Sequence, residues 1–308
     1  MGTVHDILET HGRQAALGFD LDRVVVEAAA SYMSDEDSSI GFLYSGWCQA
    51  ALPHKRLPDD HGWQMDGDQL SLIVEPGMRR GPSGMPVHVG VPFGSRARLI
   101  LIYLQSEALR TSNREVVLGQ SLRKWLERMQ IPVCGKNFNA VREQTERISR
   151  CRLTFEIRKG NRVGVVSQNI VDTAIFLDPA EDGPQGGLFA QTAKLSEAFF
   201  EGLKKHPVPF EEAAIAALSN NSQAMDVYVW LAYRLHSLSK PTPLSWRALK
   251  TQFGAGVAAM NNFKLRFLPN LKLALAVYPA AKVEDNGERG LILHPSPSPV
   301  SKRSIGIR

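Results

Sequence analysis

The chain has 308 residues, 44% hydrophobic and 22% charged, a composition typical of a soluble globular protein long enough for two domains. Its three cysteines lie far apart without a C-x-x-C pair, which argues against a disulfide framework or structural zinc site and favours a reducing cytoplasm. The apolar runs are too short to cross a bilayer and no secretory signal is visible, so we expect no membrane role.

The formal net charge of +5 hides two strongly basic segments. Residues 110–162 carry 13 lysines and arginines against 5 acidic residues, a net charge of +8. Residues 240–308 carry 11 against 3, again +8. Two separated basic segments are typical of a protein that binds a long polyanion at two places.

The N-terminal third has weak signals. Residues 1–40 hold one short helical stretch around Leu21–Tyr32 and then an acidic cluster, which predicts a mobile acidic tail. Glycine and proline are frequent up to residue 94, with strand-like runs at Leu70–Val74 and Val87–Val91. We interpret this part as a β-rich lead-in to a first domain over residues 41–182.

That first domain has a clear order of elements. The spacing of apolar residues predicts three helices and then a hairpin: Arg96–Arg110, Gln120–Met129, Lys136–Arg150, and two strands that start near Leu153 and Val163 around a Lys159–Asn161 turn. Helix, helix, turn, helix and hairpin describe a winged helix. The glycine- and proline-rich stretch that follows predicts a linker over residues 183–187.

A second domain over residues 188–295 repeats the order. Helices are expected near 190–205, 210–219 and 222–237. Ser245 is a candidate N-cap for a helix that ends at Gly254, and Asn262–Tyr278 predicts a long helix that Pro269 should kink. A hairpin with an Asn286-Gly287 turn closes the domain, and residues 296–308 predict a disordered basic tail. The expected fold is therefore α+β, mostly helical, with two winged-helix domains in tandem, each with a β-hairpin wing.

This scheme predicts which residues meet DNA, because the second helix of a helix-turn-helix enters the major groove while neighbouring elements touch phosphate. The base-reading candidates are Asn262, Lys264 and Arg266. The phosphate-binding candidates are Arg247, Lys250, Lys272, Lys136, Arg147, Arg150, Arg158, Lys159 and Arg162. Taken singly, such residues are most often ordinary solvated groups, and Glu143 and Glu146 weaken the case for the first domain.

Signals for catalysis are sparse. No phosphate-binding loop is present, since Gly135-Lys136 is followed by Asn137 and lacks the earlier glycine. His88 has no second histidine two positions away, as a metal-dependent nicking enzyme would need. We expect no catalytic residues, no metal site, no cofactor and no enzymatic activity.

Several long blocks resemble the plasmid-encoded RepA replication initiators of bacteria, over about Phe42 to Pro295. These blocks are Gly90–Arg98, Arg150–Phe155, Asn169–Asp172, Asp226–Leu235, Ser245–Lys250, Phe263–Leu268 and Leu273–Pro279. The departures are Pro269 and Leu265, where related helices carry more polar residues. The resemblance implies tandem winged helices that bind repeated origin sequences, recruit host replication initiator and helicase proteins, and in some cases form homodimers.

We therefore expect a bacterial, cytoplasmic protein that binds double-stranded DNA sequence-specifically and initiates plasmid replication. Two alternatives remain open from the sequence. The protein could be a transcriptional repressor only, or a DNA-nicking replication enzyme.

Overall fold

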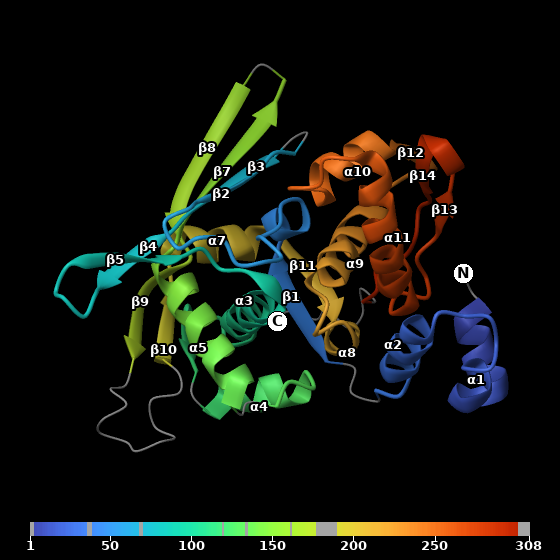
Figure 1. Cartoon of the computed structure of the whole chain (residues 1–308), viewed down its shortest axis with the longest axis horizontal. Helices are drawn as coiled ribbons and strands as arrows, with labels where there is room; N and C mark the ends of the chain where they lie inside the picture. The colour runs from blue at the N-terminus through green and yellow to red at the C-terminus, as the bar shows by residue number, and fades with distance from the viewer. Residues whose placement is uncertain are drawn as a thin grey trace. The chain divides into compact units, whose positions relative to one another are not determined.

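The computed structural model describes residues 3–35, 39–67, 70–118, 120–132, 135–160, 162–176 and 190–300 (Figure 1). The chain folds into two compact units of mixed α/β structure. The terminal unit comprises residues 1–41 and 208–308, and the central unit comprises residues 42–207. Within the described ranges, no helix has both the length and the apolar character needed to span a membrane.

Helices α3, α4 and α5 dominate the central unit, and α3 is buried along most of its length because Leu99–Leu104 is uniformly apolar apart from Tyr103. The elements of this unit are β1 (Ile40–Tyr44), η1 (Ser45–Cys48), β2 (Trp63–Met65), β3 (Leu70–Glu75), β4 (Gly77–Arg80), β5 (Pro86–Gly90), α3 (Gly94–Arg110), β6 (Glu115–Val117), α4 (Gln120–Arg128), α5 (Gly135–Arg150), β7 (Arg152–Lys159), β8 (Arg162–Asn169), β9 (Val171–Phe176), β10 (Ala190–Leu195) and α7 (Glu197–Lys205).

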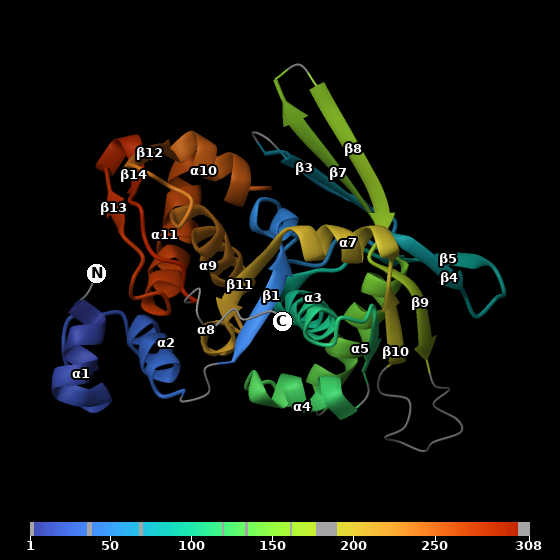
Figure 2. The ribbon, with the colours of Figure 1, turned by 180° about the vertical axis from the view of Figure 1, so that it is seen from behind.

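Strands β7 and β8 form a long antiparallel hairpin within the sheet ordered β2-β3-β7-β8. Lys159 pairs with Arg162, so the turn has two residues, and Gly160 adopts the left-handed φ of 59° that such a turn favours. The hairpin extends well beyond helices α3–α5 of the same unit (Figure 2). The alternation of residues in 153–158 predicted this element, and the structure confirms it.

The terminal unit contains both ends of the described chain. Its elements are α1 (Thr3–Ala16), α2 (Arg23–Met33), β11 (Pro207–Glu211), α8 (Glu212–Ala217), α9 (Ser222–Leu235), β12 (Thr242–Ser245), α10 (Trp246–Phe253), α11 (Met260–Ala276), β13 (Val283–Asp285), η2 (Gly287–Arg289) and β14 (Gly290–Leu293). Strand β14 pairs with β12 on one side and β13 on the other, both antiparallel.

The same order of elements occurs in both units. In the terminal unit the chain runs through a helix (α9), a strand (β12), two helices (α10, α11) and two strands (β13, β14). The three strands form a sheet ordered β12-β14-β13. In the central unit α3, β6, α4, α5, β9 and β10 follow the same sequence, and their sheet is ordered β6-β10-β9. The β7–β8 hairpin is inserted between α5 and β9. It is therefore an addition to the shared pattern, and β9–β10 is the counterpart of β13–β14.

The N-terminal segment differs from the mobile tail that the sequence predicted. Helix α2 begins at its N-cap Asp22, which accepts a hydrogen bond from the backbone N–H of Val24, and it packs against α11 and α8. His5 of α1 donates from Nε2 to the carbonyl oxygen of Ala276, 2.7 Å away, at the end of α11. The short apolar stretches of residues 3–33 fold here because α11 supplies the partner surface, which local periodicity does not reveal.

Two further expectations differ from the structure, and a third lies outside the described residues. Residues 190–195 form strand β10 where a helix was expected, and α7 begins only after its N-cap Ser196. The predicted linker 183–187 lies outside the described residues, but the strands that flank it, β9 and β10, pair with each other within the central unit. Residues 296–300 of the predicted disordered tail are packed, with Ser296 and Val300 buried, while 301–308 lie outside the described residues.

Candidate nucleic-acid interface

Helix α11 presents one fixed face to solvent because its other face is locked in an aromatic cluster. Phe263 and Phe267 are buried and stack at 5.3 Å between ring centroids. Phe267 also contacts Phe253 of α10 at 5.3 Å and Trp246 at 6.4 Å. Rotation of α11 would expose these rings, and burial of one such side chain stabilises the fold by about 1.5–3 kcal/mol. The orientation of α11 is therefore determined by its aromatic residues.

The outward face of α11 consists of residues spaced three and four positions apart, all exposed: Asn262, Leu265, Arg266 and Pro269. Among the described residues, the side chains of Asn262 and Arg266 have no hydrogen-bond or ion-pair partner, so their donors are available to a ligand. Pro269 lies within a continuous helix from Met260 to Ala276. The two predicted base-reading groups precede it by seven and three residues.

Lys264, the third predicted base-reading residue, is held away from this face. Its Nζ forms an ion pair with Glu288 Oε2 at 2.9 Å and lies over the Trp246 ring, 5.1 Å from its centroid. Trp246 in turn donates from Nε1 to the carbonyl oxygen of Gly287 at 2.7 Å. Lys264 thus connects α11 to the η2 turn between β13 and β14, and this placement disagrees with a direct base-reading role.

Helix α10 begins where the sequence predicted. Ser245 is its N-cap and accepts a hydrogen bond from the backbone N–H of Ala248 at 3.2 Å. Arg247 is exposed, and its side chain has no hydrogen-bond or ion-pair partner among the described residues. Lys250 is half-buried, and its Nζ donates to the carbonyl oxygen of Ala258 at 2.6 Å. Arg247 is therefore available for phosphate, whereas Lys250 ties α10 to the turn before α11.

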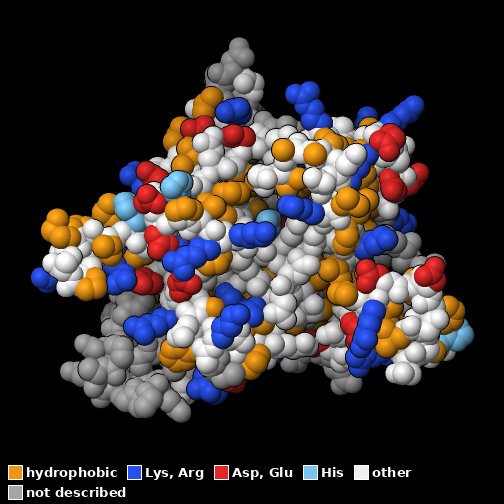
Figure 3. Space-filling model, viewed as in Figure 1, with side chains coloured by type: hydrophobic (Ala, Val, Ile, Leu, Met, Phe, Trp, Pro, Cys, Tyr) orange, Lys and Arg blue, Asp and Glu red, His pale blue; other side chains and the backbone are white. Residues whose placement is uncertain are grey.

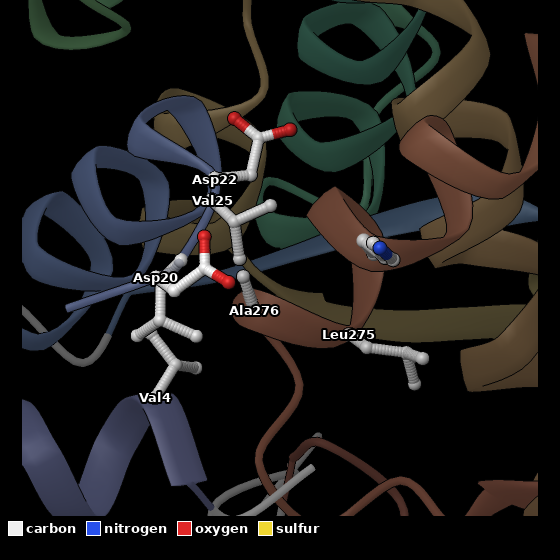
Figure 4. A pocket seen from close by; sticks show the side chains of 8 residues that line it. Val4, Asp20, Asp22, Val25, Leu275 and Ala276 are labelled. Carbon is white, nitrogen blue, oxygen red and sulfur yellow. The ribbon is translucent and has the colours of Figure 1, made fainter.

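Lys272, a predicted phosphate-binding residue, is exposed but lies on another side of α11. It lines a cavity of about 210 Å³ together with Asp20 and Asp22 of the α1–α2 connection. Figure 4 shows both carboxylates at this cavity beside Val4, Val25, Leu275 and Ala276. Two nearby carboxylates reduce the attraction of Lys272 for a phosphate group.

In the central unit, charged side chains of α5 form ion pairs within the protein. The Arg147 side chain is 2% exposed, although it was predicted to bind phosphate. Its guanidinium donates to Asp59 at 2.7 Å, to Glu143 at 2.9 Å and to the carbonyl oxygen of Val91 at 3.0 Å. Gly90, with a φ of 77°, leaves room for this guanidinium, since a Cβ there would collide with it. The structure thus buries Arg147, against the expectation that it binds phosphate, and two of its partners, Asp59 and Val91, lie far away in the sequence.

The surrounding charges complete this network. Arg56 pairs with Asp59 at 3.0 Å and with Glu143 at 3.2 Å. Burial alone would raise the pKa of the Asp59 carboxyl, but the hydrogen bond and charge of Arg147, with those of Arg56, outweigh this and lower it. Arg56 and Asp59 thus cover part of α5, and Arg56 pairs with its Glu143 carboxylate.

The remaining predicted phosphate contacts of the central unit lie at its periphery. Arg150 is exposed but pairs with Glu146 at 3.4 Å and donates to the carbonyl oxygen of Met78 at 3.1 Å. Lys136, near the start of α5, and Arg158, on β7, are exposed. The side chains of Lys159 and Arg162 lie outside the described ones, and their backbones pair at the end of the β7–β8 hairpin.

On the face shown in Figure 3, basic side chains project from the surface over α10 and the β12–β14 sheet of the terminal unit. Exposed cations beside an outward helix face are the electrostatic arrangement that a nucleic-acid duplex requires.

Comparison with solved structures identifies the class of fold. The chain matches the crystal structure of domains 2 and 3 of RctB with a TM-score of 0.54 and 10% sequence identity, over 84% of this chain and 99% of that one. A second RctB structure, covering residues 155–483 of that protein, matches with a TM-score of 0.47 and 9% identity over 80% of this chain and 93% of that one. A search of curated protein sequences found no significant match.

The sequence itself identifies the family. The model of the plasmid-encoded RepA protein family matches residues 91–246, just over half of the chain. The chain belongs to this family of plasmid replication initiators. The matched part ends at Trp246, before α11 begins.

Proposed function

We propose that the protein initiates plasmid replication by binding repeated origin sequences in double-stranded DNA, and that both units contain a winged helix. The shared order of helices and strands, with sheets β12-β14-β13 and β6-β10-β9, supports the tandem fold. In this interpretation α10 and α11 form the helix-turn-helix of the terminal unit, and β13–β14 is its wing.

The observation that carries the proposal is the outward face of α11. Asn262 and Arg266 are exposed on one helix face with unpaired donors, and Asn suits adenine while Arg suits guanine through two parallel hydrogen bonds. Arg247 contacts phosphate beside them. Lys264 contributes indirectly by holding the η2 turn against α11.

The central unit has a supporting role in this proposal. Lys136, Arg158, Lys159 and Arg162 add non-specific contacts to phosphate, and the unit also provides surface for a second copy or for host initiator and helicase proteins. Because α5 is occupied by Asp59 and Arg56, we do not assign it a base-reading role. We propose no catalytic role for any residue.

The proposal is tested first by footprinting on the plasmid's non-coding repeats, where evenly phased protection about one helical turn apart is expected. Arg266→Ala should then cost about 1–3 kcal/mol of specific binding and relax selectivity at one base pair. Arg23→Ala is the matched control, because it removes an exposed arginine of the same unit on α2. Equal losses of specific and non-specific affinity in the Arg266→Ala variant contradict the assignment.

Two further assays separate the alternatives. A plasmid that carries the repeats and has no other origin should replicate only when this protein is supplied, whereas a pure repressor leaves it unreplicated. Supercoiled target plasmid incubated with the protein and magnesium should stay supercoiled, whereas a nicking enzyme relaxes it.

A further inference from the structure

The most exposed large hydrophobic side chain among the described residues lies at the centre of the proposed reading face. Leu265 is 73% exposed, and its neighbours on this face are Asn262 and Arg266. Phe263 and Phe267 on the opposite side hold the helix in this rotation, so Leu265 has no route into the core. The packing of the terminal unit therefore does not explain a leucine at this position.

The chemistry of the major groove offers an apolar partner of the right kind. Base edges there present hydrogen-bond donors and acceptors, and the 5-methyl group of thymine is the apolar feature among them. Leu265 lies within one helical turn of both Asn262 and Arg266, which present polar groups suited to the same groove. The positive charge of Arg266 beside the leucine also favours a polyanion over an apolar protein surface.

We propose that Leu265 is a specificity-determining residue that packs against the 5-methyl group of a thymine next to the base pair read by Arg266. This inference rests on the proposed function and adds a base preference to it. Apolar contact discriminates thymine from cytosine, which lacks the methyl group, and from uracil. It also explains why a leucine occupies a helix position where a polar residue would be better solvated.

The test removes the methyl group alone. Within a duplex that carries the footprinted repeat, each thymine is replaced in turn by deoxyuridine, which preserves every Watson–Crick and major-groove hydrogen bond. The wild-type protein should lose affinity about fourfold at one position, the value expected for one buried carbon group. The Leu265→Ala variant should bind the thymine and uracil duplexes equally at that position.

Matched controls separate this contact from a loss of folding. Val24→Ala removes an exposed apolar side chain from α2 of the same unit, and this variant should keep the full sensitivity to the methyl group. Thermal unfolding of Leu265→Ala should equal that of the wild type, because the side chain is exposed.

Three results overturn the inference. If the wild type binds specifically but loses no affinity at any uracil position, the methyl contact is refuted. If the sensitivity to the methyl group persists in Leu265→Ala, the assignment of this contact to Leu265 is refuted. Both results leave the proposed function standing. The absence of sequence-specific duplex binding by the wild type refutes both the contact and the proposed function.

Discussion

Helices α5 and α11 hold the same position in the order of elements of their units, yet they use charge in opposite ways. Arg147 of α5 is buried between Asp59, Glu143 and a backbone carbonyl. Arg266 of α11 is exposed without a partner among the described residues. The comparison teaches that a basic helix in a repeated architecture is a DNA-reading candidate only when its cations remain unpaired after folding.

The largest expected difference between the two helices is in stability. Arg147→Ala leaves the Asp59 and Glu143 carboxylates without their main cation. We therefore expect the free energy of unfolding to fall by about 3 kcal/mol. This is the lower end of the range for broken buried ion pairs, because both acids retain contact with water. Arg266→Ala should change it by less than about 0.5 kcal/mol. Urea denaturation of both variants measures the difference. Equal losses of stability in Arg147→Ala and Arg266→Ala would contradict the proposed difference between α5 and α11.

A second experiment separates Arg247 from Lys250 on α10. Arg247 is free for phosphate, so Arg247→Ala should reduce the slope of log affinity against log salt by about one for every DNA sequence. Lys250 donates to Ala258, so Lys250→Ala should mainly lower stability, by about 1.5 kcal/mol, the lower end for one lost hydrogen bond to a charged group. DNA titrations at several salt concentrations give the slopes. A slope change for Lys250→Ala equal to that for Arg247→Ala would restore Lys250 as a phosphate contact.

The α5 network also predicts a dependence of stability on pH. The pKa of Asp59 is lowered in the folded state, so the unfolded chain binds more protons at acidic pH and stability falls as pH decreases. The contribution is complete above the ordinary pKa of an aspartate, about 3.9, and is lost as pH falls through the lowered value. Asp59→Asn should flatten this part of the curve, measured by denaturation at a series of acidic pH values. An unchanged acid limb would show that Asp59 does not titrate with folding.

The smallest expected effect concerns Lys264. Glu288→Gln removes the carboxylate that pairs with Lys264 at 2.9 Å. One fewer negative charge near the proposed interface should raise DNA affinity at low salt, and the gain should shrink as salt screens it. Glu197→Gln, an exposed glutamate of the central unit, is the control. A loss of affinity in Glu288→Gln would mean that the Lys264–Glu288 pair positions the wing for binding.

Elements with a long repeating pattern could be predicted from the sequence. The structure places α3, α4 and α5 within two residues of the expected boundaries at each end, and Ser245 caps α10 as expected. The three-residue strand β6 could not be found, because so short a segment shows no alternation. Strand β12 was missed for a similar reason, since its burial alternates only between half-buried and exposed. Because β6 and β12 were not predicted, the sequence did not reveal that the two units share one sheet order.

The candidate site was predicted in part. Asn262, Arg266 and Arg247 are exposed as expected, because a long amphipathic helix with aromatic residues on one side leaves its polar residues on the other. Lys264 sits on the same helix, yet the Trp246 ring and Glu288, far along the chain, determine where its amine lies. The exposed Leu265 had a signal in the sequence, as a departure from the polar pattern of related helices.

The sequence by itself determined helices α3, α4, α5, α9, α10 and α11, the β7–β8 hairpin, the two basic segments and the resemblance to RepA proteins, since each depends on local periodicity, on composition or on contiguous motifs. Only the tertiary structure decided that α1 and α2 pack within the terminal unit, that Arg147 is buried and that Lys264 pairs with Glu288 beside η2. These features depend on contacts between residues distant in the chain, and the same charged side chain is a ligand contact or an internal ion pair according to which partners folding brings within reach.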